Sequence, residues 1–306
     1  MHTLVMTGAT RGIGWFAAAA LLHDDPELRL VVLARESTSA EAVRELRAHD
    51  RVTVVDTELA SIDGVESAGQ AVGAMLDSGE LPPLRGFVGN AGVQFTDALH
   101  TTPDGLETTF AVNVLANHLL LRALESRLVS PARIVITNSG THFGDLRHTY
   151  GLTPAPRWAD PSVLAQPGAF PSPGTAAAGY TAYATSRLAA IYLVHEWARR
   201  LPHGVDIVAH SPGLVPATGH GRHAKPFARF LNDRIVPLLT VTPAIDNAAT
   251  AGRRLAATVT GRTPAPSGSY VDRIRVTPSS DESYNVERER ALWDYLETVR
   301  LRNVNG

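Results

Sequence analysis

The sequence of 306 residues contains no cysteine. The absence of thiols excludes disulfides, cysteine-ligated zinc, iron–sulfur clusters and thiol catalysis. An excess of charge of either sign is also missing, because 28 Lys and Arg residues stand against 30 Asp and Glu residues, for a net charge of -2. Sequence-independent binding to nucleic acid depends on excess positive charge, so we expect no nucleic-acid partner.

Long hydrophobic runs are missing as well. The longest apolar stretch near the start, Trp15 to Leu22, is far shorter than the roughly 20 residues that a membrane span requires. An apolar segment from Leu4 to Met6 begins almost at the first residue, which leaves no room for a leader peptide. Hydrophobic residues make up 44% of the chain, which is ample material for a core. We therefore expect a cytoplasmic protein without a membrane span.

Short apolar runs alternate with helical stretches along most of the chain, which predicts repeated βαβ units and a parallel sheet buried on both faces. Right-handed crossovers make this a doubly wound, three-layer α/β/α fold. The expected strands are 4–7, 30–34, 52–55, 86–89, 133–137 and 205–210, and the expected helices are 13–22, 40–48, 64–76, 106–128, 182–201 and 288–301.

Length alone, at roughly 150 residues per domain, suggests two domains. The sequence has no linker between independent units, so we predict one domain over residues 1–306. Two segments interrupt the alternation. Residues 153–174 contain six prolines and predict a long ordered loop within an insertion at 140–180. Residues 214–240 form the second interruption and are mixed apolar and basic.

A glycine-rich turn follows the first strand and opens the first helix. It reads Thr7-Gly8-Ala9-Thr10-Arg11-Gly12-Ile13-Gly14. Glycines permit a tight turn and a close approach of the backbone to a pyrophosphate, while the helix N-terminus supplies free N–H groups and partial positive charge. The turn therefore predicts a dinucleotide site, to which we assign Gly8, Thr10, Arg11, Gly12, Ile13 and Gly14.

The spacing of these glycines, together with later motifs, resembles the short-chain dehydrogenase/reductase family, whose fold is a Rossmann fold. Further motifs of the family follow in order along the chain. They are Asn90-Ala91-Gly92 after the fourth strand, Asn113 in the long helix, Ser139 after the fifth strand, Tyr183 with Arg187, and Pro212-Gly213 after the sixth strand. The resemblance implies an oxidoreductase that uses a nicotinamide cofactor.

Cofactor choice depends on the residue that ends the second strand. Arg35 is suited to the 2′-phosphate of NADP, with Arg11 as a second cation, whereas the adjacent Glu36 favours NAD. We predict NADP(H). Near the adenine the family has an Asp-Leu pair. Aligning on the leucine places Glu58 and Leu59 there, with Asp56 as the alternative to Glu58.

The resemblance also implies catalytic roles. In the family a tyrosine donates the proton, a serine binds the substrate oxygen, and a lysine holds the nicotinamide ribose and favours the ionised tyrosine. An asparagine connects the lysine to solvent through water. These roles fall to Tyr183, Ser139, Arg187 and Asn113. Tyr180 is excluded as the donor because the residue four positions later is Ala184.

Arg187 departs from the family pattern, in which this residue is a lysine. A guanidinium keeps the positive charge but differs in shape and does not give up a proton. Three outcomes follow: an ordinary reductase that tolerates arginine, a slow or strongly pH-dependent enzyme, or chemistry without net hydride transfer. The last includes epimerisation, dehydration and cyclisation. A nucleotide-sensing binding protein is the alternative outside enzymes.

The substrate region is enlarged relative to the plain family form. The insertion between Ser139 and Tyr183 carries His142, Phe143, His148, Tyr150, Trp158 and Phe170, and we expect it to form a wall or lid over the substrate. The stretch from Ser211 to Gly219 resembles a subgroup that includes retinol dehydrogenase-like and protochlorophyllide reductase-like proteins. In that subgroup similar residues contact the nicotinamide amide and then lead into a substrate lid. The resemblance therefore implies contacts from Pro212, Gly213, Val215 and Thr218, and a substrate lid over residues 214–240.

His220 and His223 lie in the predicted lid, next to Arg222 and Lys225. Because the flanking cations would repel a metal ion, we predict no metal site and assign the histidines to the lid or to exposed positions. The predicted function is NADP(H)-dependent reduction of a carbonyl, or its reverse, on a medium-to-large small molecule. High Ala, Arg and Pro content suggests a GC-rich genome and a role in secondary metabolism. The oligomeric state is expected to be a monomer or a homodimer.

Overall fold

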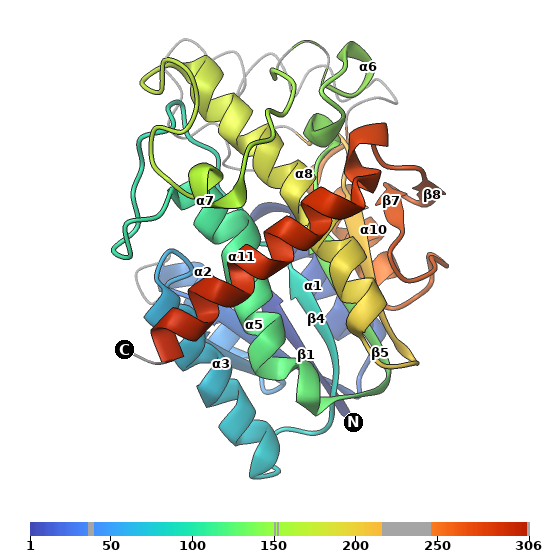
Figure 1. Cartoon of the computed structure of the whole chain (residues 1–306). Helices are drawn as coiled ribbons and strands as arrows, with labels where there is room; N and C mark the ends of the chain where they lie inside the picture. The colour runs from blue at the N-terminus through green and yellow to red at the C-terminus, as the bar shows by residue number, and fades with distance from the viewer. Residues whose placement is uncertain (36–39, 150, 152, 216–245, 305–306) are drawn as a thin grey trace.

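The computed structural model describes residues 1–35, 40–149, 151, 153–215 and 246–304 (Figure 1). The strands are β1 (His2–Thr7), β2 (Leu28–Ala34), β3 (Val52–Asp56), β4 (Leu84–Gly89), β5 (Leu128–Thr137), β6 (Val205–Ser211), β7 (Tyr270–Asp272) and β8 (Arg275–Thr277). The α-helices are α1 (Gly12–Asp24), α2 (Ala40–Ala48), α3 (Ile62–Asp77), α4 (Thr108–Phe110), α5 (Ala116–Leu124), α6 (Leu146–Thr149), α7 (Pro161–Leu164), α8 (Ala176–Arg200), α10 (Ala248–Val259) and α11 (Val286–Val304). Shorter helical turns are η1 (Ala111–Leu115), η2 (Glu125–Arg127), η3 (Gly140–Phe143) and η6 (Asp281–Tyr284).

The described strands form one sheet in the order β3-β2-β1-β4-β5-β6-β7-β8, and the predicted doubly wound α/β fold is confirmed. All neighbouring strands are parallel except β7 and β8, which are antiparallel. Only two residues, Arg273 and Ile274, join these last strands, and such a short connection permits only an antiparallel pair. The strand order reverses between β1 and β4, which creates a crevice at the carboxyl ends of these strands.

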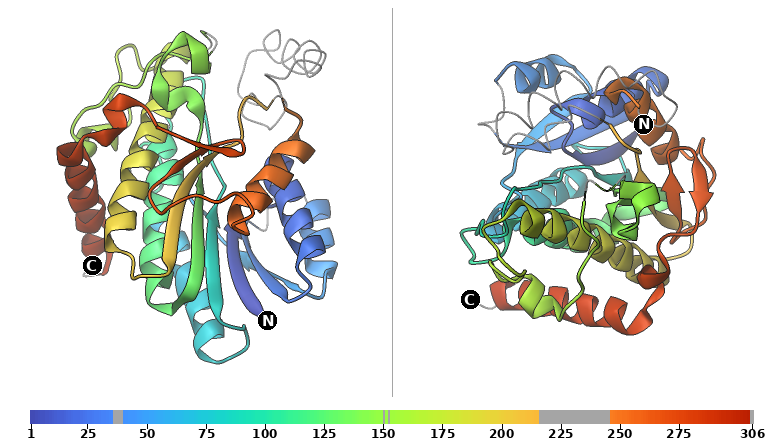
Figure 2. Two further views of the ribbon diagram at one scale, coloured as in Figure 1. Left: turned by 90° about the vertical axis from the view of Figure 1, so that its right-hand side faces the viewer. Right: turned by 90° about the horizontal axis from the view of Figure 1, so that it is seen from above.

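Successive side chains of the central strands point to opposite faces of the sheet, and each face has its own core. Val5 and Val31 pack on the side of α3, α5 and α8, whereas Met6 and Val32 pack on the side of α1 and α10. Figure 2 shows the sheet between these two helical layers. This arrangement explains why the central strands are apolar at nearly every position, since both faces are covered.

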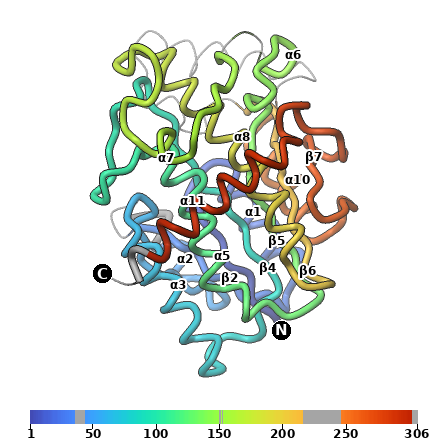
Figure 3. The backbone as a smooth tube through the Cα atoms, in the orientation of Figure 1, coloured from blue at the N-terminus to red at the C-terminus, as the bar shows by residue number. Residues whose placement is uncertain are grey.

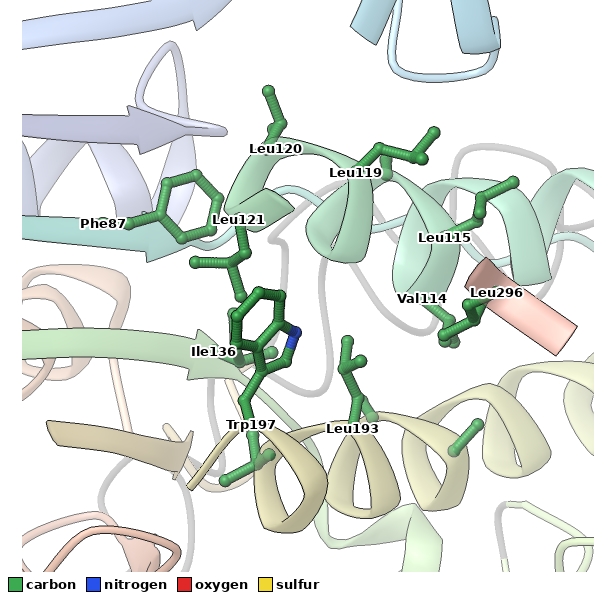
Figure 4. Packing of buried hydrophobic residues seen from close by; sticks show 14 of the residues in the cluster. Phe87, Val114, Leu115, Leu119, Leu120, Leu121, Ile136, Leu193, Trp197 and Leu296 are labelled. Atoms are coloured by element: carbon green, nitrogen blue, oxygen red, sulfur yellow. The ribbon is translucent and has the colours of Figure 1, made fainter. Parts of the chain in front are cut away.

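The larger core lies between the sheet, α5 and α8. Trp197 of α8 is fully buried and packs among leucines of α5, with Phe87 of β4 and Ile136 of β5 nearby (Figure 4). Burying each large apolar side chain contributes on the order of 1.5–3 kcal/mol. This core holds α8 rigidly against β5, and α8 carries both Tyr183 and Arg187.

The structure differs from the sequence-based expectation in several elements. The predicted helix over 106–128 is divided by the π-helical turn η1, which contains Asn113. The proline-rich segment includes the short helix α7, which begins at Pro161, where proline is tolerated because a first-turn N–H has no helical partner. The helix α10 and the hairpin of β7 and β8 were not predicted.

The last helix, α11, crosses the outer side of α5 and α8 (Figure 1). His118 of α5 contacts both the Trp293 ring and the Glu297 carboxylate of α11. Burial lowers the pKa of His118, and the Glu297 pKa is lowered to about 2 by hydrogen bonds from His118 and Arg300, against the opposing effect of its own burial. In the described part of the chain, no helix is both long and apolar enough to cross a membrane.

Candidate active site

The predicted site residues gather at the carboxyl edge of the sheet. Thr7 of β1 pairs with Gly89 of β4, and Thr137 of β5 pairs with His210 of β6. The motifs that follow these strands therefore emerge side by side, although they are far apart in sequence. Figure 3 shows that the chain around α6 and the start of α8 lies beyond this same end of the molecule. This edge is where ligands bind in open parallel sheets.

The glycine turn packs directly on the residues that follow β4. A Cβ atom at Gly8 would lie 2.7 Å from the backbone N of Ala91, and one at Gly14 would lie 2.0 Å from the Gly8 carbonyl oxygen. Gly8 also has a φ of 68° and Gly12 a φ of 54°, which favour glycine. The turn thus needs glycine for its own packing, because the protein already fills the space that a side chain at Gly8 or Gly14 would take.

Side-chain hydrogen bonds fix the ends of β1, β4 and β5 to one another. The Thr7 hydroxyl oxygen accepts from the backbone N–H groups of Asn90 and Ala91, each at 3.0 Å. The Asn90 Nδ2 donates to the Gly8 carbonyl at 3.0 Å, and its Oδ1 accepts from the Thr137 hydroxyl at 3.1 Å. Asn90 therefore joins the glycine turn to the carboxyl end of β5.

The start of α1 differs from the starts of the other long helices. Side chains of Ser61, Thr175 and Asn247 accept backbone N–H bonds at the N-caps of α3, α8 and α10. The N-cap of α1 is Arg11, which has no side-chain acceptor. The first amides of α1 therefore have no N-cap side chain to bind, which suits an anionic ligand at this helix end. Arg11 itself is exposed beside this turn.

Arg35 lies at the end of β2, and its Nη1 is 3.4 Å from the Oε2 of Glu58. Both side chains are about half exposed. The other oxygen of Glu58 accepts from the backbone N–H of Ala60 at 3.0 Å. Glu58 thus directs the guanidinium of Arg35, a contact that the sequence did not predict. Asp56 is an exposed residue at the end of β3, Leu59 packs against the core, and Glu36 lies outside the described residues.

Asn113 is fully buried in the π-helical turn and connects three elements. Its Nδ2 donates to the Val93 carbonyl and to the Ser186 hydroxyl, both at 3.0 Å, and its Oδ1 accepts from the Val93 N–H at 2.9 Å. Its own carbonyl accepts from the Asn117 Nδ2 at 3.0 Å. The side chain predicted as a proton relay is therefore engaged in joining this turn to α8 and to the loop after β4.

Tyr183 and Arg187 share one face of α8 and are both buried. The Arg187 Cζ lies 4.8 Å from the centre of the Tyr183 ring. Arg187 Nη1 donates to the Thr137 carbonyl at 3.0 Å, while Nη2 lies 2.3 Å from where a Cβ of Gly92 would be. Gly92 thus makes room for the guanidinium, because a side chain at this residue would occupy the same space. Asn113 Oδ1 also lies close to the position that a Cβ atom of Gly92 would take.

The buried charge of Arg187 has no acidic partner in the described part of the chain. No described carboxylate lies within ion-pair distance, and the Nε atom has no hydrogen-bond partner there, although only 4% of the residue is exposed. Burying a cation without a counter-ion lowers the free energy of unfolding by on the order of several kcal/mol. Charge retained at this cost is typical of a functional site.

Ser139 lies two residues after Thr137 and begins the turn η3, where its hydroxyl accepts from the Thr141 N–H at 3.3 Å. His142 contacts the backbone of Ser139 and holds it in place. The His142 Nδ1 lies 2.7 Å from the Ser139 carbonyl oxygen, and its Nε2 accepts from the Ser280 N–H at 3.3 Å. Burial lowers the pKa of His142 to about 4, so the ring is neutral and each nitrogen has one role. Asn138 Nδ2 donates to the Arg187 carbonyl at 3.1 Å, which ties α8 to this strand end.

An open cavity of about 470 Å³ lies between the first part of the insertion and the start of α8. Tyr180, one turn before Tyr183, forms part of its wall, and Asp145 is the charged side chain among the described lining residues. The His148 ring stacks on Phe143 with centroids 3.7 Å apart, and its Nδ1 is 2.8 Å from an Asp145 oxygen. This volume lies within the range of small-molecule sites.

The sequence of this chain matches known proteins. A family model described as short chain dehydrogenase matches residues 2–149. A protein of Streptomyces sp. (strain C5), named as a daunorubicin C-13 ketoreductase, is 30% identical over 232 residues, covering 75% of this chain and 71% of its own. The chain belongs to the short-chain dehydrogenase/reductase family. The predicted family resemblance is confirmed, and the chain is an oxidoreductase of that family.

Two other relatives of this short-chain dehydrogenase/reductase extend the comparison. Human retinol dehydrogenase 13 is 27% identical over 312 residues, covering 98% of this chain and 84% of its own. The NADPH-bound carbonyl reductase from chicken fatty liver superposes with a TM-score of 0.60 at 17% identity, covering 90% of this chain and 98% of its own. At that identity the structural likeness concerns the fold.

The structure of this short-chain dehydrogenase/reductase places the remaining predicted residues as follows. Pro212 is buried after β6, and Gly213 has a φ of 79°. Val215 is the last described residue before the gap that ends at residue 246, while Thr218, His220 and His223 of the predicted lid lie outside the described residues. Of the aromatic residues in the insertion, Trp158 and Phe170 face the core instead of the cavity, because Trp158 packs edge-on against Tyr192 at 4.7 Å and Phe170 is buried.

Sequence reasoning missed three residues that build the site and expected His142 in the substrate wall, whereas the structure buries it behind Ser139. Asn117, Asn138 and Ser186 hold Asn113 and Arg187 in place, and His142 holds Ser139. Of these, only Ser186 and Asn138 had a signal in the sequence, because each directly precedes a predicted catalytic residue.

Proposed function

We propose that this chain is an NADP(H)-dependent carbonyl reductase in which Tyr183 donates the proton. The observation that carries the proposal is the buried guanidinium of Arg187, which lies on the face of the Tyr183 ring with no described carboxylate beside it. A fixed positive charge next to a phenol favours the phenolate that remains after proton donation. The cation thus stabilises the charge that develops on Tyr183 during reduction.

The cofactor fits the residues at the edge of the sheet. In the proposal the pyrophosphate lies against the glycine turn, and the first amides of α1, which no N-cap side chain binds, meet its charge. When bound, NADPH supplies the hydride. In the proposal the loop of Asn90 to Gly92 lies along the cofactor, and Arg187 holds the nicotinamide ribose.

The choice of NADP(H) rests on Arg35 and Arg11. Arg35 is half exposed at the end of β2, and an incoming 2′-phosphate would replace Glu58 as its anionic partner. The predicted cofactor agrees with the carbonyl reductase neighbour, whose structure contains NADPH.

Each remaining residue has one role in the proposed reaction. Ser139 donates a hydrogen bond to the substrate carbonyl oxygen, which prepares that oxygen to receive the proton of Tyr183. His142 keeps Ser139 in position through its backbone carbonyl, and Asn113 keeps the loop of Gly92 beside Arg187. We place the carbonyl substrate in the cavity whose lining includes Tyr180, Asp145 and Pro154, and whose volume suits a medium-to-large molecule. The ketoreductase name of the Streptomyces relative supports a substrate from secondary metabolism.

The test is a fluorescence titration of the purified protein with NADPH and NADH, followed by turnover of a panel of aromatic and polycyclic ketones. We expect micromolar binding of NADPH, weaker binding of NADH and stoichiometric loss of NADPH with alcohol formed. Conversion of a substrate without net loss of NADPH would replace this proposal by the redox-neutral chemistry that Arg187 also suggests. Absence of binding to either nucleotide would overturn the dinucleotide site itself.

We also infer that the chain is a monomer, the first of the two states expected from sequence. Dimers of the family commonly use the helices that here are α5 and α8, and α11 lies across both of them. Light scattering of the purified protein at micromolar concentration tests this directly, and a dimer mass would overturn it.

A further inference from the structure

Arg273 is unusual because its backbone lies in the left-handed region. Its φ is 57°, and it occupies the two-residue turn between β7 and β8. A residue with a Cβ pays on the order of 1–2 kcal/mol for this conformation, which glycine or asparagine adopts more readily. An arginine at this position indicates that its side chain contributes something that a better turn residue would lose.

The side chain of Arg273 lies against Gly213, in the loop that leaves β6. A Cβ atom at Gly213 would lie 2.6 Å from the Arg273 Nε and 3.3 Å from its Cζ. The backbone N–H of Arg273 donates to the carbonyl of Ser211 at 2.8 Å. The hairpin turn is therefore bonded to the last residue of β6, and its guanidinium covers the residue two positions further along.

Asp246 contacts both the loop that leaves β6 and the side chain of Arg273. Its backbone N–H donates to the Leu214 carbonyl at 3.1 Å, and its Oδ2 lies 3.4 Å from the Arg273 Nε. The same carboxylate oxygen pairs with Arg254 of α10. Because the Asp246 side chain is only 13% exposed, these ion pairs are less screened by solvent than surface pairs.

Residues 212–215 leave the sheet next to the catalytic edge. His210 of β6 pairs with Thr137 of β5, whose carbonyl holds Arg187. This loop therefore begins two residues beyond the strand position that pairs with Thr137, at the same edge of the sheet as Arg187.

We propose that Arg273 is a positioning residue, which together with Asp246 fixes loop 212–215 in the conformation that receives the nicotinamide end of the cofactor. The cofactor part of this inference rests on the proposed function. The structural part does not, because the contacts among Arg273, Gly213 and Asp246 are made by the protein alone.

The experiment compares Arg273→Asn, Asp246→Asn and the matched control Arg275→Asn. Asparagine tolerates the left-handed backbone, so Arg273→Asn removes the side chain while keeping the turn. Asp246→Asn breaks the ion pairs and leaves the hairpin sequence intact. Arg275 is an exposed arginine of the same hairpin. Amide hydrogen exchange over residues 211–215 is measured without cofactor, and the Kd and KM for NADPH are measured alongside the melting temperature and kcat.

We expect Arg273→Asn and Asp246→Asn to speed exchange over residues 211–215 and to raise the Kd and KM for NADPH by about tenfold, the equivalent of one well-placed interaction. The kcat at saturating NADPH should change by less than about twofold, as expected for a lost binding contact. Arg275→Asn should match the wild type, and Arg273→Lys should restore part of the loss. If Arg273→Asn exchanges and binds like Arg275→Asn, the inference is wrong while the proposed function stands. If the wild type binds no NADPH, the proposed function falls, and the exchange data still decide whether Arg273 holds the loop.

Discussion

The Arg187 guanidinium covers the face of the Tyr183 ring, with its central carbon 4.8 Å from the ring centre. The charge therefore acts on the aromatic system from above, at a position set by the Thr137 carbonyl and by the open space at Gly92. A lysine has one ammonium group and cannot occupy both places at once. The site is thus shaped around a planar cation, which is the reason to expect that arginine here is required.

Arg187→Lys should accordingly lower kcat even though it restores the residue typical of the family. Losing one charge-assisted hydrogen bond and the stacked position costs about 1.5–3 kcal/mol, which corresponds to roughly a tenfold to hundredfold fall in kcat. Arg187→Met keeps an unbranched side chain but removes the guanidinium and its charge, and should lower kcat further and move the pH profile of kcat. The measurement is steady-state kinetics from pH 6 to 10. Equal or faster turnover by Arg187→Lys would show that the arginine is merely tolerated.

Tyr183→Phe tests the proton donor. General acid catalysis contributes about 10²–10⁴-fold, so kcat should fall by that factor. The Kd for NADPH should stay within about twofold, because the ring and its contact with Arg187 remain. Tyr180→Phe is the matched control, since it alters a hydroxyl on the cavity wall one turn earlier on the same helix. A Tyr183→Phe protein that keeps its biological activity would favour the alternative of a nucleotide sensor.

The ion pair of Arg35 and Glu58 predicts opposite effects of two substitutions on NADPH affinity. Arg35→Ala should weaken NADPH binding by roughly tenfold to hundredfold, because a hydrogen bond to a charged group contributes about 1.5–3 kcal/mol. Glu58→Gln removes the competing carboxylate, and should tighten NADPH binding. Neither change should alter NADH binding by more than about threefold, since NADH lacks the 2′-phosphate. The measurement is a fluorescence titration of the wild type, Arg35→Ala and Glu58→Gln with NADPH and with NADH. A parallel loss of both affinities in Arg35→Ala would contradict the assignment of Arg35 to the 2′-phosphate.

The sequence predicted the elements that have a strong local signal. The glycine turn identified β1 and α1, and the four-residue spacing placed Tyr183 and Arg187 on one helix face. In contrast, α10 was not predicted because its buried residues are mostly small, as at Ala251, Gly252 and Ala256, and form no continuous apolar run, although they lie on one face of the helix. The strands β7 and β8 are three residues each, too short for an alternating pattern.

Side-chain directions in the site depended on contacts between distant parts of the chain. Arg187 is oriented by Thr137 and Gly92, which lie about 50 and 95 positions earlier, and no local spacing encodes that geometry. The pairing of Arg35 with Glu58 likewise requires β2 and β3 to be adjacent, which is known only once the sheet order is known. Residue types in the site could therefore be predicted, whereas their partners required the fold.

Two buried histidines predict how stability depends on pH. Burial lowers the pKa of His142 to about 4, and burial together with the charge of Arg254 lowers the pKa of His210 to about 3. Both values lie below the unfolded value of about 6.5, so the unfolded chain binds more protons between these limits. The free energy of unfolding should therefore be highest above pH 6.5 and fall as the pH drops, by up to about 1.4 kcal/mol per pH unit for each histidine.

His210→Asn isolates one of these contributions. The asparagine amide can keep a hydrogen bond to the Thr258 hydroxyl, which now lies 3.0 Å from the His210 Nδ1, and it does not titrate. Urea denaturation between pH 5.0 and 7.5 should give a pH slope that is shallower than the wild-type slope by up to about 1.4 kcal/mol per unit. His203→Asn, at an exposed position, is the control and should keep the wild-type slope. An unchanged slope in His210→Asn would mean that His210 is protonated in the folded protein, which its complete burial next to Arg254 argues against.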